Sequence, residues 1–290
     1  MIATTGFFDG VHSGHRLVIE RLVSLARERG DESLVVTFWP HPRAVLQDGA
    51  RELRLLNSLE EKKELLRSLG VDRIEVLDFT RSFAALTAEQ YLRDVLRSRF
   101  GVTTLLMGYD NRLGSDRLTA ASLKPIATSI GIELVELEPL GHPDLTPVSS
   151  TKIRKALEDG DIAASNEMLG YGYALKGVVV AGNRLGRTIG FPTANMKLYE
   201  PLKLVPGRGV YVVEAEVLGR KYRGMTNIGL RPTVGGSFTT IETHILDFDE
   251  DIYGLPLRIT FLRRLRDEVH FPSLEALKRQ LEKDRDCCRE

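Results

Sequence analysis

The stretch GFFDGVHSGHRLVIERLV, residues 6–23, joins three kinds of local sequence. It follows a short apolar run, it contains three glycines, and from His15 onward its apolar residues recur at helical spacing. This order predicts a strand, a glycine-containing turn, and a helix that begins near His15. Because His12 and His15 lie three residues apart at the helix start, both imidazoles are expected on one side of it.

The predicted turn has the chemistry of a phosphate site. The start of a helix offers unpaired N–H groups and the positive end of the helix dipole, which together attract anions. Two imidazoles there can donate hydrogen bonds to phosphate oxygens and stabilise charge that grows in a transition state. Gly10 and Gly14 allow the backbone to approach a ligand closely. Surface histidines beside turn glycines are the alternative, but the strand–turn–helix context favours the phosphate site.

The chain as a whole shows two successive patterns of predicted secondary structure. Up to about residue 158, short apolar runs alternate with helical patterns, and residues 87–90 fit a capping box. After about residue 170 the pattern is a series of strands separated by Gly, Pro and Asp turns, and only the end is helical, with Ser273 as its N-cap. We therefore predict an α/β domain with a parallel Rossmann-like sheet over residues 1–169. A small antiparallel β-barrel closed by a helix is predicted over residues 170–290.

The charge balance and apolar content of the chain limit the classes of partner that it is expected to bind. The chain of 290 residues carries 40 basic and 40 acidic side chains, so it has no basic footprint for nucleic acid or an anionic membrane, and small molecules are the expected partners. It has neither a secretory leader pattern nor an apolar run long enough to span a bilayer, which predicts a cytoplasmic protein. The adjacent Cys287 and Cys288 cannot connect distant segments, and no zinc site is expected. The oligomeric state stays open.

The segment FDGVHSGH resembles the HxGH signature of nucleotidyltransferases, which join a nucleotide to a phosphate-bearing acceptor and release pyrophosphate. The resemblance implies in-line attack on the α-phosphate, with His12 and His15 stabilising the transition state. VSSTKIRKAL, residues 148–157, is similar to the second motif of that superfamily and implies triphosphate contacts. The implied nucleotide-binding residues of this half are Gly6, Phe8, Asp9, Gly10, Gly14, Ser149, Ser150 and Arg154.

Two further segments, FWPHPRAVL and GYDNRLGSDR, resemble those of bacterial bifunctional riboflavin kinase/FMN adenylyltransferases. The resemblance implies a flavin pocket, and its residues in this half are Pro40, His41, Pro42, Gly108, Asp110, Asn111 and Arg117. The chain departs from the family at Trp39, where Asp is common, and at Asn111 and Leu113, where the motif has Phe. These departures bear on how the isoalloxazine ring is held and not on the phosphate chemistry.

A second phosphate loop is predicted in GNRLGRTIGFPTANM, residues 182–196. It is one residue short of a Walker A motif and lies in the all-β half, so a Walker loop is not favoured. Its backbone N–H groups and its arginines still suit phosphates, and Thr193 and Asn195 offer oxygens to Mg²⁺. It is similar to the PTAN motif of riboflavin kinases, in which Thr and Asn contact Mg²⁺ and a nucleotide phosphate. The implied nucleotide-binding residues here are Gly182, Gly186, Arg187 and Gly190.

A carboxylate completes this second set. A kinase that acts on an alcohol benefits from a group that accepts the hydroxyl proton, and Glu242 resembles the catalytic glutamate of the family. By itself, a glutamate that alternates with apolar neighbours on a strand is most often a solvated residue, and the resemblance is what favours the catalytic interpretation of Glu242. The flanking segments TNIGLRPTVGG and RRLRDEVHFPSLEAL also match the riboflavin kinase pattern, and Arg266 is an implied flavin contact.

The resemblance implies an enzyme that phosphorylates riboflavin to FMN in its second domain and joins AMP from ATP to FMN in its first, giving FAD and pyrophosphate. Mg²⁺ and ATP are the implied cofactor and co-substrate. Two alternatives remain: a riboflavin kinase whose first domain has lost or weakened adenylyl transfer, and a catalytically silent flavin or nucleotide sensor.

Overall fold

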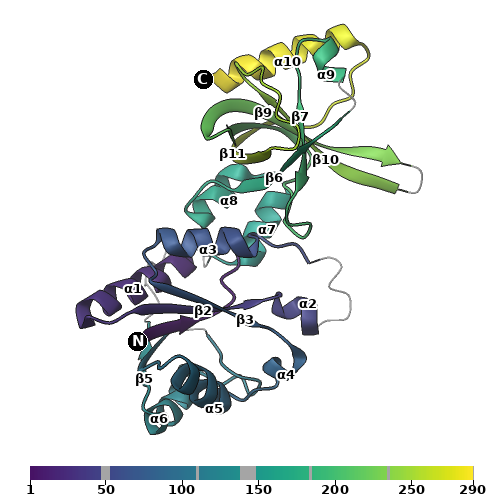
Figure 1. Cartoon of the computed structure of the whole chain (residues 1–290). Helices are drawn as coiled ribbons and strands as arrows, with labels where there is room; N and C mark the ends of the chain where they lie inside the picture. Colours follow the sequence, from purple (N-terminus) through teal and green to yellow (C-terminus); the bar gives the residue numbers. More distant parts are fainter. Residues whose placement is uncertain (47–52, 109–110, 138–147, 183–184, 234–235, 290) are drawn as a thin grey trace. The chain divides into compact units, whose positions relative to one another are not determined.

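The computed structural model describes residues 1–46, 53–108, 111–137, 148–182, 185–233 and 236–289. The chain forms two compact units, Met1–Ser149 and Ser150–Glu290, which we describe separately (Figure 1). Among the described residues, no helix has both the length and the apolar character needed to cross a bilayer.

The first unit is built on a parallel sheet, as predicted. Its five strands have the order β3-β2-β1-β4-β5, and every neighbouring pair is parallel. The strand order reverses between β1 and β4, and ligands of such sheets bind outside the carboxyl ends of the strands at this position. The strands are β1 (Ile2–Thr5), β2 (Ser33–Trp39), β3 (Arg73–Asp78), β4 (Thr104–Met107) and β5 (Glu133–Glu136).

Helices cover both faces of the sheet because successive strand residues point to opposite sides. Ile2 and Val35 pack with residues of α1 (Ser13–Arg29) and α3 (Leu59–Ser68) in one apolar cluster. Ala3 and Leu34 pack on the other face. The elements on that second face are α5 (Ala88–Gln90), the π-helix η2 (Tyr91–Arg99) and α6 (Ala120–Ile130). Two short helices, α2 (Pro42–Leu46) and α4 (Arg81–Ala84), follow β2 and β3.

The helix boundaries follow local capping signals. The predicted capping box at Thr87 and Gln90 is confirmed, and α3 begins with a second one at Ser58 and Glu61. Helix α1 begins at Ser13, slightly before the predicted start, because the His12 side chain serves as its N-cap. These caps fix the starts of helices that follow β1, β2 and β3.

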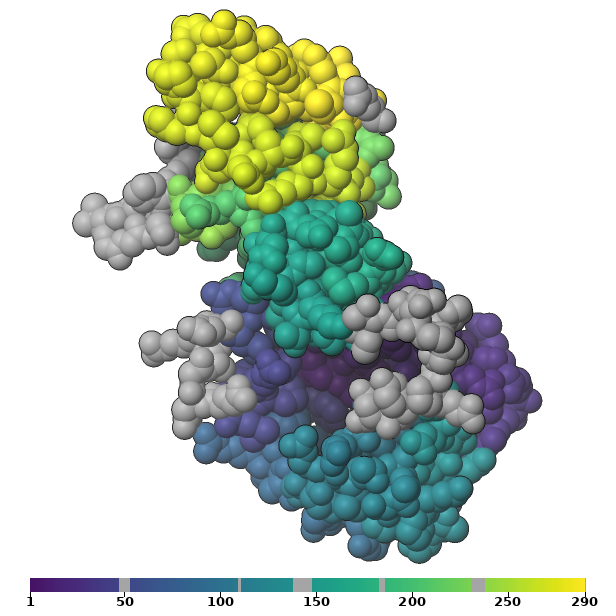
Figure 2. Space-filling model, turned by 180° about the vertical axis from the view of Figure 1, so that it is seen from behind, coloured from purple at the N-terminus to yellow at the C-terminus, as the bar shows by residue number. Residues whose placement is uncertain are grey.

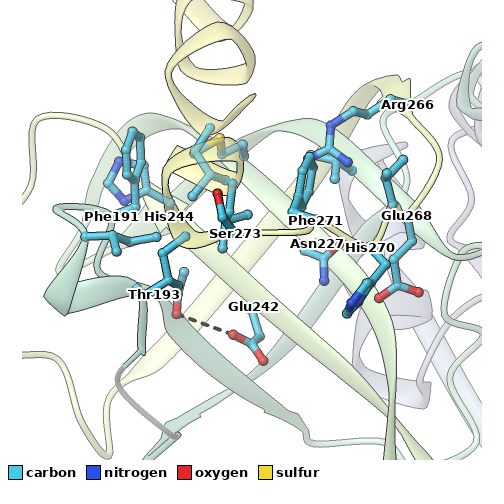
Figure 3. Close-up of a pocket in the computed structure, with 18 residues that line it drawn as sticks. Phe191, Thr193, Asn227, Glu242, His244, Arg266, Glu268, His270, Phe271 and Ser273 are labelled. Atoms are coloured by element: carbon cyan, nitrogen blue, oxygen red, sulfur yellow. Dashed lines mark hydrogen bonds between the residues drawn. The ribbon is translucent and has the colours of Figure 1, made fainter. Parts of the chain in front are cut away.

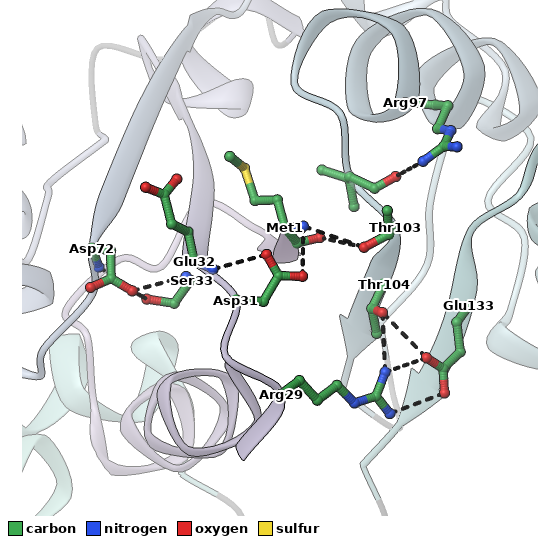
Figure 4. Close-up of polar contacts among 11 residues, drawn as sticks. Met1, Arg29, Asp31, Glu32, Ser33, Asp72, Arg97, Thr103, Thr104 and Glu133 are labelled. Carbon is green, nitrogen blue, oxygen red and sulfur yellow. Dashed lines mark hydrogen bonds and ion pairs between the residues drawn. The ribbon is translucent and has the colours of Figure 1, made fainter. Parts of the chain in front are cut away.

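Polar side chains join the amino ends of the strands (Figure 4). The Asp72 carboxylate accepts hydrogen bonds from the Ser33 backbone N–H and hydroxyl at 2.9 and 2.6 Å, at the start of β2. Glu133, at the start of β5, accepts from Arg29 and, at 3.2 Å, from the Thr104 hydroxyl at the start of β4. The amino ends of the strands are thus joined by a network of hydrogen bonds and ion pairs. The histidine turn lies at the opposite end, where the chain leaves the carboxyl end of β1.

The second unit contains the predicted closed antiparallel barrel, with the strand order β10-β7-β6-β11-β8-β9. The strand β7 was not expected, since residues 182–196 were predicted to form a loop; its residues pair with β6 on one side and β10 on the other. The short helix α9 (Leu185–Thr188) precedes it. The strands are β6 (Ala174–Val180), β7 (Ala194–Leu198), β8 (Gly209–Val217), β9 (Arg220–Thr233), β10 (Gly236–Ile245) and β11 (Pro256–Arg266).

Two helices upstream of the barrel belong to the second unit. These are α7 (Ser150–Glu158) and α8 (Ile162–Leu169), coloured teal against the barrel in Figure 2. The Asn166 amide donates to the Phe261 carbonyl of β11 at 3.0 Å, and the Leu157 carbonyl accepts from the Gly207 N–H at 2.8 Å. The compact units therefore divide at residues 149 and 150, ahead of the boundary at 169 and 170 that the sequence predicts, because these helices pack on the barrel.

The last helix, α10 (Leu274–Arg289), packs against the barrel. It begins as predicted, with the Ser273 hydroxyl accepting from the Ala276 N–H at 3.1 Å. Leu281 and Cys288 join an apolar cluster with residues of β8, β9 and the loop before β7. Both cysteines are free thiols, and burial raises the pKa of Cys288 to about 11.

Candidate active sites

The turn after β1 holds the two histidines together. Their rings stack with centroids 3.6 Å apart, which confirms that both lie on one side of the helix start. The Nδ1 atom of His12 accepts a hydrogen bond from the backbone N–H of His15 at 3.4 Å. A neutral imidazole has one acceptor and one donor nitrogen, so His12 carries its proton on Nε2. The cap therefore fixes the tautomer that can donate to a ligand.

Burial keeps both rings uncharged at neutral pH. It lowers the pKa of His12 to about 4, although a backbone hydrogen bond opposes the shift. Burial also holds the pKa of His15 well below its ordinary value, and the nearby His12 and Lys62 lower it further. The Nδ1 atom of His15 is buried without a hydrogen-bond partner among the described residues. An unsatisfied buried nitrogen of this kind is costly, and a bound ligand would satisfy it.

The backbone of the turn is held in an uncommon conformation. Phe8, Gly10 and Val11 have φ angles of 54°, 86° and 36°. Positive φ is unusual for a bulky or β-branched residue, and such strain persists only where the surroundings enforce it. Phe8 and Val11 are both buried, and the buried Asp9 accepts from the Leu56 backbone N–H at 3.1 Å. The shape of the turn is thus held by its buried side chains and by the hydrogen bond between Leu56 and Asp9.

The sequence-predicted flavin walls follow neighbouring strands. Pro40 and His41 come directly after β2, with a cis Trp39–Pro40 peptide, and the His41 ring contacts the Phe7 ring at a centroid distance of 4.2 Å. Pro42 begins α2. Because β1 and β2 are adjacent in the sheet, the carboxyl end of β2 meets the histidine turn.

The second predicted wall follows β4, the other neighbour of β1. Gly108 comes directly after that strand and is buried, whereas Asn111 and Arg117 are exposed. Leu113 packs against the core cluster of this face. Asp110 lies outside the described residues. Of the predicted residues of this wall that the structure describes, Gly108 alone is buried, directly after the strand that pairs with β1.

The residues of the second motif fall at the division between the units. Ser149 is the last residue of the first unit, and Ser150 begins α7 in the second. Arg154 lies within α7 and is half-buried. The structure thus places Ser150 and Arg154 in the other unit from His12 and His15.

The barrel brings three predicted residues together. Glu242 of β10 lies opposite Asn195 of β7 on one side and Asn227 of β9 on the other. Residues that face each other across strands have Cβ atoms about 4.5–5.5 Å apart. The Thr193 hydroxyl donates to a Glu242 carboxylate oxygen at 3.5 Å (Figure 3). Sequence reasoning did not single out Asn227, although its place in the family-like segment TNIG would have been a signal.

Two cavities meet at Thr193, which lines both. The larger, about 590 Å³, has Glu242 and Asn227 on one wall and apolar residues such as Phe191 and Leu277 on another. The smaller, about 250 Å³, is lined by Gly182, Arg187 and Asn195. A site of this kind can hold two ligands whose reacting ends meet between the cavities.

Two predicted glycines of the loop are required by close packing. A Cβ on Gly182 would lie 2.3 Å from the Asn195 amide nitrogen, and one on Gly186 would lie 2.1 Å from the Phe191 carbonyl oxygen. Gly190 is different, because it is exposed and a Cβ there would meet nothing within 4 Å, although its φ is +84°. Gly182 thus gives the Asn195 side chain its room.

The donor set fits a hard cation. Thr193, Asn195 and Glu242 present oxygen atoms, the ligands that Mg²⁺ prefers. No group of three or more His, Cys, Asp or Glu side chains able to hold a metal occurs among the described residues. A Mg²⁺ ion with few protein ligands and further oxygens from phosphate and water is consistent with this arrangement.

Arg266, the predicted flavin contact of the barrel, lines the larger cavity, but its charge is already engaged. The buried Asp284 carboxylate accepts from its Nε and Nη2 atoms at 2.7–3.1 Å. His244 lines the same cavity; its Nδ1 contacts the Pro192 carbonyl at 2.8 Å, and burial lowers its pKa. Sequence reasoning missed three other lining residues of this cavity, Glu268, His270 and Phe271.

Comparisons with known proteins match both units. Residues 1–152 match the family model described as FAD synthetase, and residues 169–290 match that described as riboflavin kinase. Curated relatives include two proteins named bifunctional riboflavin kinase/FMN adenylyltransferase. The protein from Escherichia coli K12 is 37% identical over 100% of this chain and 92% of its own length, and that from Bacillus subtilis is 35% identical over 98% and 90%.

A solved structure matches the whole chain. It is the crystal structure described as a macrolide-efflux protein from Streptococcus pneumoniae, with a TM-score of 0.93 and 33% identity. The match covers 100% of this chain and 93% of that one. With both family models and the full-length relatives in agreement, the chain belongs to the bifunctional riboflavin kinase/FMN adenylyltransferase family.

Proposed function

We propose that the chain makes FAD from riboflavin in two steps that both use ATP. The barrel phosphorylates riboflavin to FMN, and the α/β unit joins AMP to the FMN phosphate and releases pyrophosphate. The observation that carries this proposal is the meeting of Glu242, Thr193 and Asn195 at the junction of two cavities, in a chain whose other unit holds a stacked histidine pair on a strained turn.

In the kinase step, the larger cavity holds riboflavin, with the flavin ring against its apolar wall. Glu242 accepts the proton of the ribityl hydroxyl and orients that oxygen. The smaller cavity holds the ATP phosphates, with the Arg187 side chain and the Gly182 backbone, which both line it, as donors. Thr193 and Asn195 hold Mg²⁺, which supplies charge neutralisation to the phosphates when bound.

In the adenylyl transfer step, the nucleophile is the FMN phosphate, which is already an anion and needs no general base. The turn therefore acts by positioning and by charge stabilisation. The His12 Nε2–H group and the His15 ring donate to the α-phosphate, and the backbone from Phe8 to Gly14 surrounds it. The segments after β2 and β4 hold the flavin, and Ser149, the last residue of the first unit, contacts the triphosphate.

The alternative of a riboflavin kinase without adenylyl transfer gains no support from the family matches. The FAD synthetase model matches residues 1–152, which include both the histidine turn and the departures at Asn111 and Leu113. A cytoplasmic location belongs to the same proposal, because ATP is available there. The formal net charge of 0 is consistent with small molecules as the partners.

A chromatographic time course tests the proposal. Riboflavin, ATP and Mg²⁺ are mixed with the protein, and FMN should appear first and then decline as FAD accumulates. FMN supplied in place of riboflavin should give FAD directly, with one pyrophosphate per FAD. FMN that accumulates without FAD would favour the kinase-only alternative, and unchanged riboflavin would contradict the proposal for the barrel.

A further inference from the structure

The first unit contains a buried lysine that the proposed chemistry does not use. Lys62 lies on α3 and its relative exposure is 0%. Its ammonium sits 3.6 Å from the centroid of the Phe7 ring and donates to the Thr37 hydroxyl at 3.2 Å. Among the described residues, no carboxylate lies within ion-pairing distance of it. Burying a cation without an ion pair is expensive, so the charged form of Lys62 is disfavoured unless an anion lies nearby.

The contacts of Lys62 all lead to the histidine turn. Thr37, which accepts from the ammonium, donates to the Phe7 carbonyl at 3.2 Å. The Phe7 ring covers the ammonium from the turn side. Leu56, a few residues before α3, donates its N–H to Asp9. Lys62 and the residues before it thus contact the turn at three points. These are the Phe7 carbonyl, reached through Thr37, the Phe7 ring, and the Asp9 carboxylate.

The charge of Lys62 also reaches the site. It lowers the pKa of His15, and Asp9 in turn favours the charged form of Lys62. Burial nevertheless lowers the pKa of Lys62 to about 7. The titratable groups that interact with it are Asp9 from the turn and His15 from α1, and the Phe7 ring that covers it also contacts the ring of His41. From β2 only the Thr37 hydroxyl contacts it among the described residues.

We propose that Lys62 is a positioning residue of the adenylyl-transfer site. Its ammonium holds the turn that contains Phe7 in its strained shape and provides a buried positive charge that a phosphate bound at the turn balances. The inference rests on the proposed function of the first unit, since it assumes that the turn binds phosphate. It assigns a role to a helix residue that lies outside both superfamily motifs.

A coupling between phosphate binding and proton uptake follows. An anion beside a buried amine stabilises its protonated form, so binding raises the pKa of Lys62 above about 7. At pH 8 the free protein therefore has a largely neutral Lys62, and the complex a charged one. Both histidines are neutral at this pH in the free protein, because their pKa values are depressed. Affinity for a phosphate anion should accordingly weaken as the pH rises above 7.

The first test uses Lys62→Met, which keeps the length of the side chain and removes its charge. Lys63→Met is the matched control, since Lys63 is the next residue on α3 and its ammonium forms an ion pair at 2.9 Å with Glu60, whose side chain is 70% exposed. For Lys62→Met we expect the inhibition constant of inorganic pyrophosphate, measured against FMN adenylylation at pH 7, to rise about tenfold or more. Lys63→Met should shift it less than twofold, and riboflavin phosphorylation should be unchanged in both variants.

The pH profile separates positioning by charge from a merely structural role. In the unaltered protein the inhibition constant should rise between pH 7 and 9, and in Lys62→Met this rise should be absent. A folded Lys62→Met protein with the unaltered inhibition constant and pH profile would overturn the proposal. Failure of the proposed function is a different outcome, because then the unaltered chain would form no FAD from FMN at all.

A second measurement needs no variant and covers the case in which Lys62→Met does not fold. Pyrophosphate binding to the unaltered chain at pH 8 is followed by calorimetry in two buffers of different ionisation enthalpy. After correction for protonation of free pyrophosphate, we expect uptake approaching one proton per bound ligand, roughly 0.5–1. Uptake near zero would contradict the proposed coupling.

Discussion

The two candidate sites of this chain differ in the chemical groups that they offer to a phosphate. The histidine turn uses backbone in positive-φ conformations and two neutral, buried imidazoles, and its buried carboxylate, Asp9, is bound to the Leu56 N–H. The barrel site uses oxygen-bearing side chains on paired strands, with Glu242 between two asparagines. One site is strained and rich in N–H donors, and the other is regular and rich in oxygens.

This difference matches the needs of the two acceptors. An FMN phosphate is already ionised, so the first site has only to position it and stabilise charge on the phosphorus being attacked. An alcohol must lose a proton, so the second site needs a base within reach of the hydroxyl. The comparison teaches that the presence or absence of an available carboxylate separates the two chemistries.

Replacing the base gives the largest expected effect. In Glu242→Gln the amide cannot accept the hydroxyl proton, so kcat for riboflavin phosphorylation should fall about 10²–10⁴-fold. FMN adenylylation by the same protein should stay within twofold. Glu214→Gln, which changes a carboxylate on β8 that pairs with Lys221, is the control and should affect neither rate. Retained kinase turnover in Glu242→Gln would contradict the claim that an available carboxylate distinguishes the barrel site from the histidine turn.

Removing the imidazoles tests the other half of the comparison. His12→Ala combined with His15→Ala removes both donors from the turn, and FAD formation from FMN should fall about 10²–10³-fold or more. Riboflavin phosphorylation, measured as FMN released by the same variant, serves as the internal control. Loss of both activities in a protein that still folds would show that the two sites are not independent.

A smaller effect is expected from Gly182→Ala, which sharpens the assignment of the two cavities. The new methyl group would collide with the Asn195 amide, and overpacking of this kind costs about 1–3 kcal/mol. We expect KM for MgATP in the kinase reaction to rise roughly 5–100-fold, with KM for riboflavin little changed. An equal rise in both KM values would mean that the smaller cavity is not specific for the nucleotide.

The smallest effect concerns pH and the stability of the first unit. The pKa of His12 is lowered in the folded state, so the unfolded state binds protons first as the pH falls below 6.5. The free energy of unfolding should therefore drop by about 2–3 kcal/mol between pH 7 and 4.5. Trp39, the only tryptophan, reports unfolding of this unit by its fluorescence. In His12→Asn the drop should be smaller, and an unchanged drop would contradict the assignment.

Much of the architecture could be predicted from local sequence. Alternating β and α patterns indicated the parallel sheet, and Gly, Pro and Asp turns between strands indicated the barrel. The strand β7 was missed because ANMKL is short and lies between glycine-rich and polar segments, so only its partners β6 and β10 make it a strand. The compact units also divide before α7, since packing on the barrel is a tertiary effect.

The same limit applies to the sites. Motifs identified His12, His15, Thr193 and Glu242, but the contact of Thr193 with Glu242 depends on strand pairing across the barrel. Lys62 escaped notice because a lysine in EEKKELL has the composition of a solvated helix face. A signal existed, since Lys62 lies four residues before the buried Leu66 and thus on the same face of α3.

The shortness of β7 has a consequence for the motions of the barrel. In the part of the chain that the structure describes, two residue pairs, Glu242 with Asn195 and Thr243 with Ala194, connect β7 to β10, so we expect the barrel to open most easily between these strands. Asn195, the proposed Mg²⁺ ligand, lies on β7, and Glu242, the proposed base, lies opposite it on β10. Any fluctuation that separates these two strands disrupts the kinase site. A nucleotide that bridges them should therefore slow amide hydrogen exchange along β7 more than anywhere else in the barrel.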